Sequence, residues 1–187
     1  MTTKTVAQAT ANGSVAVGGG YVWASFDTGA VVRLDASGTH AVDGIAGDGA
    51  GAVAYGDGAV WVANAGDNDV GRLVPATVTT FATPTVGRRP SGIAVGGGAV
   101  WVADEGDDTV TRIDLASGSA STIPVGRGPT GIAVGAGAVW VADSDDATVT
   151  RIDLDGGRPP RTIVVGNRPT GVAVAYGRVW VTVQPTT

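Results

Sequence analysis

The sequence predicts an all-β protein, a β-propeller of five blades with about 40 residues each, on three observations. Its tryptophans recur at spacings of 38, 40, 39 and 40 residues, at Trp23, Trp61, Trp101, Trp140 and Trp180. Each follows a similar apolar segment, for example SGIAVGGGAVW and TGIAVGAGAVW. Within a repeat, four short runs rich in Val, Ile and Thr alternate with Gly-rich or Asp-rich turns, a pattern typical of strands. This period with four strands per repeat is typical of propeller blades.

The composition agrees with a single domain over residues 1–187 that contains little helix. Gly occurs 31 times, and Glu105 and Lys4 are the only charged residues that are neither Asp nor Arg. The absence of Cys excludes disulfides, thiolate metal sites and cysteine nucleophiles. A net charge of −5 argues against nucleic acid as a partner. With no signal-peptide run and no membrane-length apolar stretch, we expect a soluble chain with no membrane partner, and the compartment stays open.

The four strands of a blade are named a to d from the axis outward. In the third repeat they are expected at Gly92–Val95, Ala99–Ala103, Thr109–Leu115 and Ser121–Val125. If Asp104 pairs with Thr109, then Trp101 lies opposite Arg112 on the same face. The same arithmetic pairs Trp61 with Arg72 and Trp140 with Arg151, so in these three blades a guanidinium can stack on the indole as part of the packing of the blade.

Counting strands gives four complete blades and one composite blade built from the two chain ends. Gly171–Ala175 and Arg178–Val183 would supply strands a and b, and Thr3–Ala9 would supply strand d. One strand is missing from this blade, and an open slot in a sheet recruits strands. We therefore expect either a monomer closed by its own N-terminal strand or an oligomer formed through the incomplete fifth blade. A third interpretation is that this chain is a piece of a longer protein.

The segment VWVADEGDDTVTRIDL, preceded by RPSGIAVGGGA, resembles the YVTN-type and streptogramin-lyase-like β-propeller repeats common in bacteria. The resemblance implies a propeller that serves as a binding module, as a domain of a larger protein, or as the lyase that opens streptogramin B antibiotics. That lyase needs histidines and a glutamate beside a metal ion. This chain has one histidine, His40, and one glutamate, Glu105, in different blades, so the catalytic set cannot be carried over.

The loops that join strand d to the next strand a read GRRPSG, GRGPTG and GNRPTG, and they would surround the mouth of the central channel. The b–c loops emerge on the same face and carry eight of the sixteen Asp residues. The expected ligand-binding residues are Arg88, Arg89, Ser91, Arg127, Thr130, Arg168, Thr170, Asp104 and Asp143. The alternative reading is that Pro, Gly and Asp build the turns and that the charges are solvated.

These observations favour a non-catalytic binding or scaffold module whose Arg/Asp face takes a small polar ligand, a glycan or a protein. Two alternatives stay open: a metal-independent lyase or natural-product enzyme acting at the channel mouth, and a purely structural, fragmentary or engineered propeller with no ligand. No cofactor or metal is expected. The acidic clusters DEGDD and DSDDA could attract Ca²⁺, but they lack the Asp-x-Asp-x-Asp-Gly pattern of a calcium loop.

Overall fold

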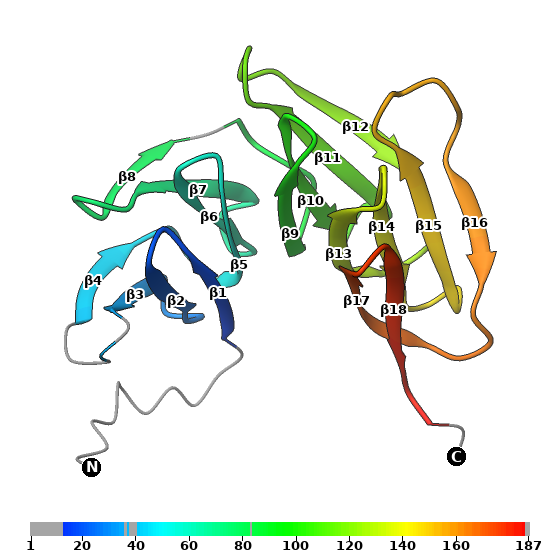
Figure 1. Ribbon diagram of the computed structural model, residues 1–187, viewed down its shortest axis with the longest axis horizontal. Helices are drawn as coiled ribbons and strands as arrows, with labels where there is room; N and C mark the ends of the chain where they lie inside the picture. Colours follow the sequence, from blue (N-terminus) through cyan, green and yellow to red (C-terminus); the bar gives the residue numbers. More distant parts are fainter. Residues whose placement is uncertain (1–12, 36, 38–40, 83, 186–187) are drawn as a thin grey trace.

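The protein is an all-β propeller whose sheets lie around one axis, as the sequence predicts (Figure 1). The structure, a computed structural model, describes residues 13–35, 37, 41–82 and 84–185. Within these residues eighteen strands form four four-stranded sheets and one two-stranded sheet, with no helix.

The strands follow one another in strict antiparallel order within each sheet. The first blade contains β1 Ser14–Gly18, β2 Tyr21–Ser25, β3 Ala30–Asp35 and β4 Ala41–Ile45, and the second contains β5 Ala50–Gly56, β6 Ala59–Asn64, β7 Asp69–Val74 and β8 Thr79–Ala82. The third contains β9 Pro90–Gly96, β10 Ala99–Asp104, β11 Thr109–Asp114 and β12 Ala120–Pro124. The fourth contains β13 Pro129–Gly135, β14 Ala138–Asp143, β15 Thr148–Asp153 and β16 Arg161–Val164, and the last sheet contains β17 Pro169–Ala175 and β18 Arg178–Val183.

The first strand of each sheet is the innermost one, because β1, β5, β9, β13 and β17 contact one another in sequence. The sheets therefore follow an arc, with the first sheet at one end and the last sheet at the other (Figure 1). The last sheet consists of strands a and b, as expected. Thr3–Ala9, the expected third strand of that blade, lies outside the described residues.

The predicted register inside the blades is confirmed. Trp101 lies opposite Arg112, and Asp104 lies opposite Thr109. The guanidinium carbon of Arg112 lies 5.6 Å from the centroid of the Trp101 ring, and the second and fourth blades repeat this contact. The first blade differs. Arg33 pairs with Trp23 in register, yet its guanidinium lies 4.6 Å from the centroid of the Tyr21 ring, because Tyr21 occupies the same face two residues earlier.

The hydrophobic core is divided among the interfaces between consecutive blades. At the three interfaces between the first four blades, the face of one blade that carries its tryptophan, here called the indole face, packs on the opposite face of the next blade, here called the aliphatic face. Between the third and fourth blades, the indole face contributes Ala99, Trp101, Ala103 and Val110, and the aliphatic face contributes Ile132, Val139, Val141 and Ile152. The indole nitrogen of Trp101 donates to the carbonyl of Gly96 at 3.0 Å, which satisfies its only polar atom.

Candidate functional site

One face of the propeller carries charged loops, which hydrogen bonds and ion pairs join together in the third and fourth blades. In the third blade, Asp107 of the b–c loop accepts the backbone N–H of Arg88 at 2.7 Å and its guanidinium Nε at 2.6 Å. In the fourth blade, Asp146 accepts the same two groups of Arg127 at 2.8 and 2.7 Å. These contacts confirm that the d–a and b–c loops share a face. They also fix two arginines that stay largely exposed.

These contacts lower the pKa of both carboxyl groups. The backbone N–H of Arg88, followed by its guanidinium, lowers the pKa of Asp107. The same groups of Arg127 lower the pKa of Asp146, which in turn raises the pKa of Arg127. The face therefore presents fixed positive and negative charges side by side.

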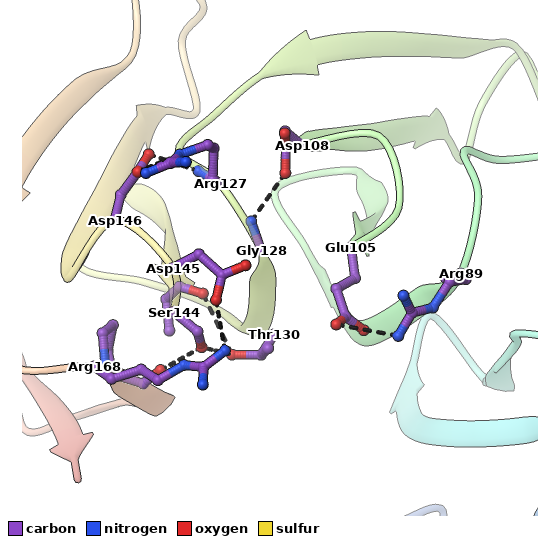
Figure 2. A network of polar contacts seen from close by, with 12 residues as sticks. Arg89, Glu105, Asp108, Arg127, Gly128, Thr130, Ser144, Asp145, Asp146 and Arg168 are labelled. Atoms are coloured by element: carbon purple, nitrogen blue, oxygen red, sulfur yellow. Dashed lines mark hydrogen bonds and ion pairs between the residues drawn. The ribbon is translucent and has the colours of Figure 1, made fainter.

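A second set of contacts links neighbouring blades near the axis. Asn68 accepts the backbone N–H of Arg89, and Asp108 accepts that of Gly128, both at 2.9 Å. The guanidinium of Arg168, before the last sheet, lies 2.5 Å from Asp145 of the fourth blade, whereas that of Arg89 lies 3.3 Å from Glu105 within the third blade (Figure 2). Glu105 was not among the expected site residues, although its position two residues before Asp107 indicates the same loop.

Arg89 has an unusual backbone for an arginine. Its φ of 53° lies in the left-handed region, and the fourth blade places Gly128, with φ of 63°, at the same point of the loop. A side chain in this region costs about 1–2 kcal/mol relative to the right-handed form. The loop thus holds an exposed guanidinium where glycine would be less strained.

Asp104 and Asp143 lie beneath the surface rather than on it. Both are fully buried, and each accepts hydrogen bonds from two threonines of strand c in its own blade. For Asp143 these are Thr148 at 3.1 Å and Thr150 at 2.7 Å. Burial raises the pKa of Asp143 to about 6, and burial also raises that of Asp104. In the sequence, these hydrogen bonds are indicated by threonines five and seven residues after each Asp.

Ser91, Thr130 and Thr170 occupy equivalent positions where strand a carries a β-bulge or a shift of register. A bulge turns a side chain out of the regular alternation. Ser91 donates to the carbonyl of Pro129 in the next blade at 2.7 Å, and Thr130 bonds to Ser144 at 2.8 Å. Ser144, which the sequence reasoning missed, also donates to the carbonyl of Pro169. These hydroxyls join adjacent inner strands at the rim of the channel.

Two hollows adjoin this face. One, of about 220 Å³, lies where the inner strands begin, and it is lined by Gly13, Ser14, Gly51, Ala52 and Ser91. A larger one, of about 580 Å³, lies farther out, against β15 and β16, and Asp146 is part of its lining. The first belongs to the predicted channel mouth, whereas the second was not anticipated.

The acidic clusters are occupied by contacts within the protein. In DEGDD and DSDDA the carboxylates of Asp107, Asp108 and Asp146 accept backbone N–H groups of the d–a loops. Over residues 13–35, 37, 41–82 and 84–185, no group of three or more His, Asp or Glu side chains is arranged to hold a metal ion. His40 lies outside the described residues. No helix suited to crossing a membrane occurs in the part of the chain that the structure describes.

Neither protein-family models nor curated proteins match the sequence. Solved structures share the fold. A streptogramin B lyase superposes with a TM-score of 0.77 at 20% identity, over 90% of this chain and 60% of that chain. A catalytically inactive virginiamycin B lyase from Staphylococcus aureus with quinupristin gives the same TM-score and identity, over 90% and 61%.

A nidogen/laminin complex gives a TM-score of 0.67 at 10% identity, over 80% of this chain and 62% of that chain. The chain therefore spans about three fifths of the length of these structures. At such identities the likeness shows the propeller fold alone.

Proposed function

We propose that this propeller is a non-catalytic binding module and that its charged loop face takes a small polar ligand rich in hydroxyl groups, such as a glycan. The observation that carries the proposal is the set of four arginines, Arg88, Arg89, Arg127 and Arg168, each held by a carboxylate on one face. Side chains fixed before binding lose little entropy on binding.

The mixture of carboxylates and guanidinium groups on this face favours a ligand that carries hydroxyl groups. A hydroxyl both donates and accepts, so it can bond a carboxylate and a guanidinium that lie side by side. Acidic residues outnumber arginines on this face, which disfavours a purely anionic ligand. The hollow beside Ser91 would admit a small group at the channel mouth.

The strained backbone of Arg89 is further support. Glycine fits this point of the loop in the fourth blade, so an arginine here carries a conformational cost without adding to the core. Such a cost is expected where the side chain serves binding.

The test is a melting-temperature screen against neutral and acidic oligosaccharides, followed by calorimetric titration of any that stabilise the protein. The site variant combines Arg89→Gly with Arg168→Ala. The matched control combines Arg158→Ala with Arg161→Ala, two arginines exposed elsewhere. We expect an oligosaccharide to bind the wild type and the control, with affinity at least tenfold weaker for the site variant. Absence of binding across the screen, or equal binding by the site variant, contradicts the proposal.

A further inference from the structure

The two ends of the arc expose faces that are buried at the interfaces between the first four blades. In β1, Val15 is 65% exposed and Val17 is 76% exposed. The residues at the position of Val15 in the second, third and fourth blades, Val53, Ile93 and Ile132, are all buried at the interfaces. The aliphatic face of the first blade therefore lacks the neighbour that covers it in the other blades.

The last sheet has the opposite deficiency. Trp180 of β18 is 57% exposed, whereas Trp23, Trp61 and Trp101 are at most 4% exposed. In the part of the chain that the structure describes, no arginine stacks on the Trp180 ring as Arg112 does on Trp101. The indole face of the last sheet is thus left open. Figure 1 shows this sheet, β17 and β18, at the opposite end of the arc from the first blade.

These two open faces are complementary. In all three hydrophobic clusters an indole face packs on the aliphatic face of the following blade. Two faces of these kinds therefore form a buried interface at three places in the protein. The first sheet offers the aliphatic half of this interface and the last sheet offers the indole half. Exposed apolar faces of this kind mark interaction sites.

We propose that the open indole face around Trp180 docks on the open aliphatic face around Val15 and Val17 of a second copy of this chain. The interface joins two different surfaces, so it is heterologous and runs head to tail. A pair of copies still has one face of each kind free. These faces then meet to close a ring or receive further copies.

The test measures molar mass by light scattering during size-exclusion chromatography over a dilution series. We expect the wild type to show at least twice the mass of one chain at high concentration. Val17→Asp blocks the aliphatic face and Trp180→Asp blocks the indole face, so each variant is expected to be monomeric alone. Because each keeps the face that the other lacks, an equimolar mixture is expected to form a dimer and no larger species.

Controls keep this result interpretable. Val164→Asp introduces the same change at a valine 79% exposed on β16, outside both faces, and is expected to assemble like the wild type. Circular dichroism checks that each variant retains its strands. If a blocking variant does not fold, acrylamide quenching of the wild type replaces it, and Trp180 is expected to become more accessible on dilution.

Three results overturn the proposal. The first is a wild type that is monomeric at every concentration, which would mean that the chain closes on itself or that another protein covers these faces. The second is a wild-type oligomer that the blocking variants leave intact. The third is a mixture of the two folded variants that stays monomeric.

Discussion

The guanidinium carbon of Arg112 lies 5.6 Å from the centroid of the Trp101 ring, directly across the β10–β11 ladder. The arginine also forms an ion pair of 2.8 Å with Asp114. Its aliphatic stem extends the cover over the indole. One side chain therefore makes both a contact with the indole and an ion pair, and its contributions can be separated by substitution.

Arg112→Met keeps an unbranched apolar side chain and removes the charge. We expect the free energy of unfolding to fall by about 0.5–2 kcal/mol, because the cation–π contact and the ion pair are both lost. Urea denaturation measures the change. Arg161→Met, at an exposed arginine on β16, is the control and is expected to have little effect. If the Arg112→Met variant were as stable as the wild type, the aliphatic stem alone would matter.

The buried carboxyl of Asp143 predicts a dependence of stability on pH. Its pKa is raised from 3.8 to about 6, mainly by burial, so between these values the folded state binds more protons than the unfolded chain. The free energy of unfolding therefore falls as the pH rises through this window, by at most about 3 kcal/mol.

Asp143→Asn removes this titration while keeping a side chain of the same shape, and Asn64 already occupies the equivalent position in the second blade. We expect the variant to be more stable than the wild type near neutral pH and less dependent on pH below it. Urea denaturation at several pH values provides the comparison. Asp155→Asn at an exposed turn supplies the same change of charge as a control. An unchanged pH profile for Asp143→Asn would refute the assignment.

Arg89→Gly replaces a residue in the left-handed region by the one that the fourth blade uses there. We expect equal or higher stability, by up to about 1 kcal/mol, because the backbone strain is relieved. Thermal denaturation is the measurement. Arg168→Gly is the contrasting variant, since Arg168 is not in the left-handed region, and it should be destabilised. If both variants lose stability equally, strain at Arg89 is not the explanation.

Gly126 lies against the buried Asp143. A Cβ added at Gly126 would lie 2.7 Å from the carboxyl carbon of Asp143, closer than real side chains approach. We expect Gly126→Ala to cost about 1–3 kcal/mol in the free energy of unfolding, as overpacked sites do. Gly157→Ala, where the nearest atom would be 3.7 Å away, is expected to change stability far less. Similar unfolding curves for the two variants would contradict this packing.

The sequence was sufficient to predict the blades because each feature recurs. Trp101 and Arg112 are 11 residues apart, and so are their counterparts in the second and fourth blades, so one register explains three sheets. The first blade departs from the arginine–tryptophan contact, because the guanidinium of Arg33 lies over the ring of Tyr21. A rule drawn from the repeats could not anticipate a difference confined to one of them.

The loop face was predicted less completely. The sequence placed Arg88 and Asp107 on the same face, but the bonds between them depend on the close approach of two loops, which spacing alone does not reveal. Asp104 was expected among the surface acids, yet Thr109 and Thr111 hold it inside the blade. Its burial depends on a match between one carboxylate and two hydroxyls across a hairpin.

The arrangement of the tryptophans is tested most directly by a diffraction map of the protein. It should show Trp23, Trp61 and Trp101 enclosed between consecutive sheets that turn about a single axis, with Arg72 and Arg112 over the indoles of their own blades. Sheets stacked along a straight line, or these indoles facing solvent on the outer strands, would contradict both the propeller and the complementarity of its two ends.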